Sequence, residues 1–203
     1  MTLAEIRTRL LALCNRTDCT PALADIFLSQ GMGRIQRELR APIMERVMVV
    51  TAHADEPIEM INLPKDYMEM IEVLCDGQPL TRSGSYRALM RQNVNAAPCN
   101  YARFGNTLYL RGVAPGGSKV ELLYYGSFSP LVADTDHNEA TDSIPDLLVY
   151  AALTFAGDHF SHDNGSAWVA RYQELLMGTQ GQAIDDEFSG GPLAISPAYP
   201  HYI

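Results

Sequence analysis

At residues 47–52 the sequence reads VMVVTA, and here the spacing of apolar residues changes from helical to strand-like. β-branched residues dominate this stretch, which is typical of a strand. Further strand-like runs, each bounded by turn residues, follow at 58–63, 68–75, 108–111 and 120–125.

Tight turns and one short helix connect these strands. Asp76-Gly77 and Gly105-Asn106 each lie between short strand-like runs and predict two hairpins. Residues 85–92 could form a short helix on the sheet. Short strands joined by tight turns indicate an antiparallel β unit, which we expect to cover residues 43–130.

Two helices are expected before this unit, within residues 1–42. Thr2 and Glu5 match a capping box, and apolar residues recur at helical spacing over residues 3–15. Thr20 and Pro21 then supply a cap and a first helical residue for the second helix.

Helices return after residues 131–142, which we expect to form an acidic loop. Ser143 is the predicted N-cap of an alanine-rich helix over residues 147–160. The small residues of this helix permit another helix to approach closely. Gly31 and Gly33 of the second N-terminal helix also suggest close packing, because each weakens a helix by roughly 1 kcal/mol relative to alanine.

The sequence therefore predicts an α+β fold in which the β unit interrupts a helical bundle. The bundle is expected to combine residues 1–42 with residues 143–180 from the other end of the chain. Residues 181–203 contain mainly glycine, glutamine, proline and serine with isolated aromatic residues, and we expect an extended tail there.

Charge is distributed unevenly along the 203 residues, whose formal net charge is −9. Residues 1–46 hold seven arginines against five acids, whereas residues 131–203 hold one arginine against eleven acids. The overall balance argues against DNA binding as the main function. The two ends could pack head-to-tail between identical subunits, or they could simply form two solvated faces.

Composition also bears on compartment and membrane association. The four cysteines are scattered without a CxxC pair, so we interpret all four as reduced and semi-buried. The longest apolar stretch, residues 144–157, is too short to span a bilayer. The N-terminal residues lack a signal-peptide pattern. We therefore expect a protein made in the cytoplasm, with no membrane partner.

Motifs for catalysis are weak or incomplete, and we predict no enzyme activity and no cofactor. Residues 134–139 (DTDHNE) resemble the start of a calcium loop, but Glu139 and Pro145 stand where that loop needs glycine and glutamate. His159, His162 and Asp163 could form part of a metal site. The alternative for this segment is a helix end, where histidines suit the negative end of the dipole.

Two groups of residues are candidates for subunit or partner contacts. Arg34, Arg37 and Arg40 lie three apart, and they form a solvated helix face, a protein interface or a contact to nucleic acid. The second group lies in the tail, because aromatic residues dominate the energetics of many interfaces. Its predicted anchors are Phe188, Tyr199 and Tyr202, although the tail could instead be a disordered terminus.

The order of several motifs resembles phage head-to-tail adaptor proteins, the tail tubular proteins of short-tailed phages, over roughly residues 1–180. After two helices come LPKDY at 63–67 and DGQPL at 76–80, then GNTLYL at 105–110. PDLLVYAAL at 145–153 and the Trp168/Tyr172 pair complete the resemblance.

This resemblance implies a structural virion protein at the head–tail interface. Such proteins form a ring, commonly of twelve copies, below the portal. The ring would continue the DNA channel without sequence-specific binding and would dock the tail nozzle or tail fibres. The alternatives are a head-completion or neck protein of a long-tailed phage and, in a different class, a metal-dependent hydrolase built around His159 and His162.

Overall fold

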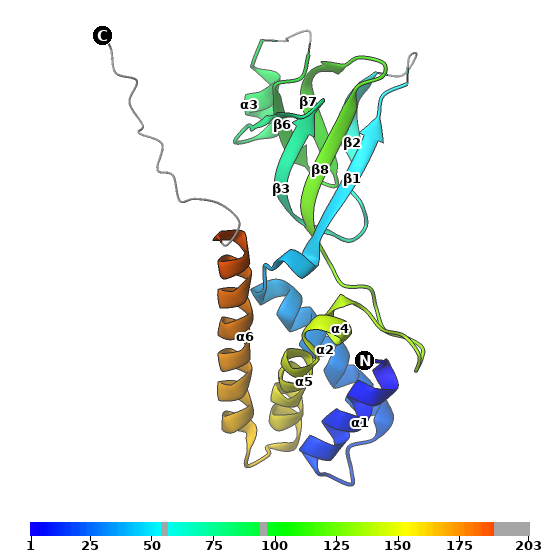
Figure 1. The fold of residues 1–203 in the computed structure, drawn as a ribbon, viewed down its shortest axis with the longest axis vertical. Helices are drawn as coiled ribbons and strands as arrows, with labels where there is room; N and C mark the ends of the chain where they lie inside the picture. The colour runs from blue at the N-terminus through cyan, green and yellow to red at the C-terminus, as the bar shows by residue number, and fades with distance from the viewer. Residues whose placement is uncertain (54–56, 94–96, 189–203) are drawn as a thin grey trace, which may run out of the picture. The chain divides into compact units, whose positions relative to one another are not determined.

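The computed structural model describes residues 1–53, 57–93 and 97–188, with the side chains of all of these except 184–188. The chain forms two compact units. One combines residues 1–43 with the chain from residue 130 onward, and the other comprises residues 44–129. Figure 1 shows that the helices of the first unit come from both parts of the sequence. The structure is therefore a mixture of helices and largely antiparallel sheets.

Over its described residues, the helical unit contains five helices. Their bounds are α1 (Leu3–Cys14), α2 (Pro21–Glu38), α4 (Glu139–Ser143), α5 (Pro145–Phe160) and α6 (Gly165–Phe188). α5 packs against α2 on one side and α6 on another, and α1 contacts both α2 and α5. Nine residues of α5 are buried, so this helix supplies much of the core. Within the described part of the chain, no helix has the length and apolar character needed to cross a membrane.

Local capping explains where the first two helices begin. Thr2 and Glu5 form the predicted capping box of α1, and the Thr20 hydroxyl accepts the Leu23 N–H at the start of α2. Both predicted starts are confirmed. The predicted cap of α5 is wrong, because Ser143 ends α4 and Ile144 precedes α5 without a side-chain cap.

Two predicted irregular segments contain helix. The acidic loop predicted at 131–142 includes most of α4, whose Asn138 cap accepts the Thr141 N–H. The extended tail predicted from residue 181 begins too early, since α6 continues to Phe188. Glycine disfavours a helix by only about 1 kcal/mol, so Gly178 and Gly181 do not end one that is already packed against α5.

The described part of the second unit, residues 44–53, 57–93 and 97–129, forms two four-stranded sheets. Its strands are β1 (Glu45–Thr51), β2 (Ile58–Asn62), β3 (Tyr67–Cys75), β4 (Gln78–Pro79), β5 (Thr81–Arg82), β6 (Asn100–Phe104), β7 (Thr107–Ala114) and β8 (Lys119–Gly126). A 3₁₀ turn (Pro42–Met44) precedes β1, and the helix α3 (Tyr86–Met90) lies between β5 and β6. All five predicted strand-like runs correspond to strands.

The strand order places several strands side by side that are distant in the sequence, such as β1 with β8 and β2 with β7. One sheet has the order β1-β8-β3-β4, which we call sheet A, and the other has the order β2-β7-β6-β5, which we call sheet B. All pairs are antiparallel except β5 with β6, so the predicted all-antiparallel unit is wrong at this one edge. Both hairpins are confirmed, at Asp76-Gly77 and at Gly105-Asn106. Asp76 and Gly77 both have positive φ, as a tight hairpin turn requires.

The core of the β unit lies between the two sheets. Val73, Val120 and Leu122 of sheet A and Leu108 and Leu110 of sheet B belong to one buried cluster. Side chains alternate along a strand, so the residues between these positions lie on the outer faces of the two sheets. The outer faces point away from each other.

Candidate interaction surfaces

The three arginines predicted as an interface group have different environments. Arg34 is half-buried inside the helical unit, where its Nη1 donates to Thr154 Oγ1 at 3.1 Å and its guanidinium lies 4.3 Å from the centre of the Tyr172 ring. Arg40 lies beyond the end of α2 and donates to the carbonyl oxygens of Gln36 and Leu39. Arg37 is exposed on α2. The structure therefore does not bring the three side chains together as one surface.

The basic and acidic ends of the chain form ion pairs with each other inside the helical unit. Arg7 contacts Asp25 at 2.6 Å and Asp134 at 2.8 Å, and Arg9 contacts Asp146 at 2.5 Å. Hydrogen bonds to Asp25 and Asp134 raise the pKa of the Arg7 guanidinium. The charge asymmetry of the sequence thus has an intramolecular partner, so it is not by itself an argument for contacts between subunits.

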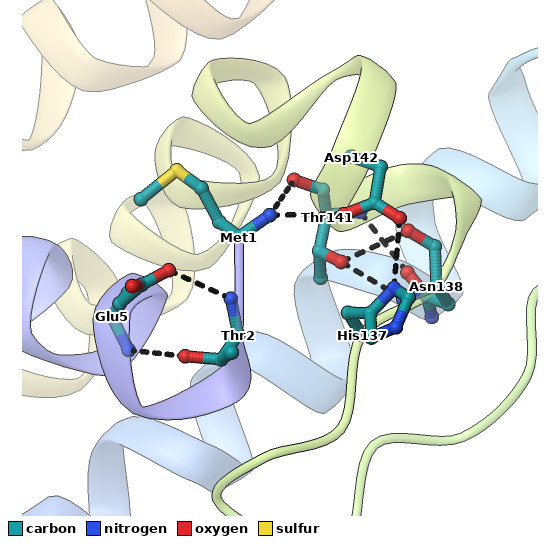
Figure 2. A network of polar contacts seen from close by, with 7 residues as sticks. All are labelled: Met1, Thr2, Glu5, His137, Asn138, Thr141 and Asp142. Atoms are coloured by element: carbon teal, nitrogen blue, oxygen red, sulfur yellow. Dashed lines mark hydrogen bonds and ion pairs between the residues drawn. The ribbon is translucent and has the colours of Figure 1, made fainter.

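The segment at 134–139, which resembles the start of a calcium loop, makes hydrogen bonds within its own loop and to the start of α1. Asp136 Oδ2 accepts the N–H groups of Ala133 and Val132, and its carbonyl oxygen accepts the Leu3 N–H. The N-terminal ammonium group contacts Asp142 at 2.9 Å, and His137 bonds to the other oxygen of the same carboxylate (Figure 2). These acids therefore take part in structural contacts.

The histidines near the end of α5 pack on aromatic rings. His159 lies between Phe27 and Phe160, with ring centres 5.5 and 4.7 Å away. His162 stacks on Trp168 at 4.5 Å, and its Nδ1 accepts the Asn164 N–H. Over residues 1–53, 57–93 and 97–188, no group of three or more possible metal ligands is present. The environment of both histidines is that of a packed helix end.

The predicted anchors of the tail lie at or beyond the limit of the described residues. Phe188 is the last residue of α6, and its side chain is not described. Tyr199 and Tyr202 lie outside the described residues. Their role as anchors stays a prediction.

The outer face of sheet A has an exposed apolar centre with acidic neighbours. Val47 and Val49 of β1 are 61% and 53% exposed. Val47 is paired with Leu123 of β8, and Leu123 is paired with Glu72 of β3. Val49 is likewise paired with Glu121. Strand pairing therefore places valine, leucine and glutamate side by side on one face.

The outer face of sheet B carries a groove beside α3. The groove is about 330 Å³ and is lined largely by Met60, Tyr86, Met90, Tyr109 and Arg111. The Tyr86 ring contacts those of Tyr109 and Phe104, with centres 4.8 and 5.6 Å apart. Figure 1 shows α3 beside β6. This face is aromatic, and Met60 and Phe104 on it are 64% and 65% exposed.

Basic side chains accompany the aromatic groove. Arg87 and Arg91 are exposed on and just after α3. Arg111 extends from β7 and donates from Nε and Nη2 to the Gln92 carbonyl oxygen at 2.9 and 2.5 Å, which ties the end of α3 to the sheet. The groove also contains one acid, Glu59. The two outer faces thus differ in charge: sheet A is acidic and sheet B is mainly basic.

These two faces were not among the interface residues predicted from sequence. One signal was available at residues 47–50, VMVV, where apolar residues occupy both faces of an edge strand. A strand that is apolar on both faces is typical of a sheet covered on both sides. The groove residues come from β2, α3 and β7, and Phe104 beside them comes from β6, so only the fold brings them together.

Comparison with known proteins gives one match over almost the whole chain. The family model described as SU10 adaptor protein matches residues 1–196. No curated protein matches the chain at a significant level.

Proposed function

Because the chain belongs to the SU10 adaptor protein family, a family of phage head-to-tail adaptors, we propose that it joins the portal of the head to the tail as a structural ring. The observation that carries this proposal is the family match over residues 1–196. The two exposed, partly apolar faces of the β unit support it, since a ring subunit needs a contact surface for each neighbour. We propose a ring of identical copies, with twelve as the expected number.

The ring would lie in the virion at the head–tail interface and continue the DNA channel of the portal. The net charge of −9 supports passage of DNA without sequence-specific binding, because an acidic wall repels phosphate. In the helical unit, Asp158 and Asp163 are exposed around the turn between α5 and α6. We propose that acidic residues of this part of the chain face the DNA.

The far side of the ring would dock the tail nozzle or tail fibres. The same arrangement would serve a neck protein of a long-tailed phage, in which only the partner below differs. Exposed Arg37, with Arg34 and Arg40 near it in the sequence, and the anchors Phe188, Tyr199 and Tyr202 remain proposed contacts to a neighbouring subunit or to the portal.

Heads assembled without this protein provide the direct test. The purified protein is incubated with such heads, unbound protein is removed, and bound copies per head are counted and located by electron microscopy. We expect saturation near twelve copies in one ring at the portal vertex. Absence of binding, or binding spread over the capsid surface, would contradict the proposed function. Heads that already carry the protein are the control and should take up none.

A further inference from the structure

We propose that the acidic outer face of sheet A in one copy packs against the aromatic, basic outer face of sheet B in the next copy. This inference rests on the proposed ring and names the surfaces that would close it. The A face is defined by Glu45, Val47, Val49, Glu72, Glu121 and Leu123. The B face is defined by Met60, Tyr86, Arg87, Met90, Phe104 and Tyr109.

The A face has a layout suited to a protein contact. Its cross-strand pairs place Val47 beside Leu123 and Val49 beside Glu121. Exposed Glu72 lies in the same row as Val47 and Leu123, and exposed Glu45 lies on the neighbouring row. An apolar centre with a polar rim is the common anatomy of protein interfaces.

The B face offers complementary chemistry. Phe104, Tyr86 and Tyr109 form a connected group of rings beside Met60 and Met90. Aromatic residues, methionine and arginine are enriched at interfaces. Exposed Arg87 at one side of this group would meet the glutamates of the A face, which suits electrostatic steering of the encounter.

The position of the two faces explains why a second copy is the favoured partner. They lie on opposite sides of one β unit, because the inner faces of the two sheets share the buried core. When the A face of one copy binds the B face of another, the resulting dimer still has one free A face and one free B face. Such head-to-tail contacts continue from copy to copy and close into a ring when the rotation permits.

Single lysine substitutions on each face test the pairing. Val47→Lys places a cation opposite the basic B face, and Phe104→Lys removes the most exposed ring of the B face. Both side chains are largely exposed, so the melting temperatures should stay unchanged. Met60→Lys is a second B-face variant in case Phe104→Lys affects folding. Val132→Lys, at an 81% exposed valine of the helical unit, is the matched control.

Self-association is measured by sedimentation velocity over increasing concentration. We expect Val47→Lys and Phe104→Lys each to weaken association by about tenfold or more, as loss of a central apolar contact does, and Val132→Lys to behave as wild type. An equimolar mixture of the two variants should form pairs and stop there, since each retains one intact face. A variant that still forms dimers with itself would show a symmetric contact and would overturn the proposal.

Binding to adaptor-free heads separates this inference from the proposed function. If wild type fills the heads and both lysine variants do not, the pairing of the A face with the B face is supported. This holds even if wild type is monomeric in solution. If wild type and both variants fill the heads equally, the pairing is wrong while the adaptor function stands. If wild type does not bind the heads, the proposed function fails, and solution association alone then decides the pairing.

Discussion

The hydroxyl group of Tyr172 on α6 donates a 2.7 Å hydrogen bond to Oε2 of Glu38 at the end of α2, and Tyr172 is completely buried. Arg34 completes the cluster by donating to Glu38 Oε1 at 3.1 Å and stacking on the Tyr172 ring. Burial and the neighbouring Glu38 carboxylate raise the pKa of the Tyr172 hydroxyl far above its usual value. One polar cluster therefore joins helices from the two ends of the chain.

Removing the Tyr172 hydroxyl tests the strength of this cluster. We expect Tyr172→Phe to lower the free energy of unfolding by about 1–3 kcal/mol, because hydrogen bonds to charged groups contribute that much and the carboxylate loses a partner. Urea denaturation at pH 7 measures the change. Tyr150→Phe, at a half-buried tyrosine of α5, is the control and should change little. Equal effects of the two substitutions would contradict the prediction.

A pair of glycines on α2 gives a second test of helix packing. A Cβ at Gly31 would lie 2.7 Å from the backbone nitrogen of Ala152 in α5, whereas a Cβ at Gly33 would meet only the end of the Arg37 side chain at 3.5 Å. Gly31→Ala should therefore destabilise by about 1–3 kcal/mol through overpacking. Gly33→Ala should stabilise by up to about 1 kcal/mol through helix propensity. Urea unfolding of both variants decides, and effects of the same sign would refute this interpretation.

The glycines also show how far sequence reasoning extends. Close packing was predicted at both Gly31 and Gly33, but only Gly31 lies against another helix. Helix starts at Thr2 and Thr20 and the hairpin at Asp76-Gly77 were predictable, because their signals act over a few residues. The partner of Arg34, Tyr172, is 138 positions away in the sequence, and no local signal connects the two.

The same limit applies to the candidate surfaces. Strand-like runs bounded by turn residues predicted the strands, yet the order β1-β8-β3 and the pairing of Val47 with Leu123 depend on the connections between the sheets. The groove beside α3 likewise needs side chains from three separate elements, β2, α3 and β7. The extension of α6 to Phe188 was missed because its glycines and glutamines suggest an irregular segment, although packing on α5 stabilises the helix earlier in its length.

Thiol reactivity tests the burial of the cysteines. Burial raises the pKa of the Cys14, Cys19 and Cys75 thiols, and that of Cys19 reaches about 11. Only the thiolate reacts, so at pH 8 on the order of one Cys19 in a thousand is reactive. In the folded protein, a disulfide reagent should modify these three slowly and the half-buried Cys99 faster. All four should react rapidly in denaturant, and fast reaction of Cys19 in the native protein would contradict its burial.

Acid stability depends on carboxylates that accept backbone N–H groups. Bonds from Ala133 and Val132 lower the pKa of Asp136 below its ordinary 3.8, and a bond from Lys119 lowers that of Asp76. A lowered folded-state pKa adds stability that is present above 3.8 and lost as the pH falls through the folded value. Asp136→Asn and Asp76→Asn should each be less stable than wild type at pH 7, and the difference should shrink below pH 3.8. Urea midpoints between pH 7 and pH 2.5 measure this, and a difference independent of pH would rule it out.

Truncation after residue 188 tests the proposed role of the tail. α6 ends at Phe188, so removal of 189–203 leaves every described helix complete. We expect an unchanged melting temperature and at least about tenfold weaker assembly on adaptor-free heads, because buried aromatic anchors each contribute about 2 kcal/mol or more at interfaces. Wild-type assembly of the truncated chain would show that the tail is dispensable.

Paired substitutions in the full-length chain identify what the tail contributes. Tyr199→Ala combined with Tyr202→Ala should reproduce the loss of assembly seen on truncation. Tyr199→Phe combined with Tyr202→Phe keeps both rings and is the matched control, so it should assemble as wild type if apolar burial carries the contact. If the phenylalanine pair fails as severely as the alanine pair, the hydroxyl groups are required and the anchors act through hydrogen bonds. If the alanine pair assembles normally while truncation does not, the contact lies elsewhere in residues 189–203, and the anchor assignment of Tyr199 and Tyr202 is wrong.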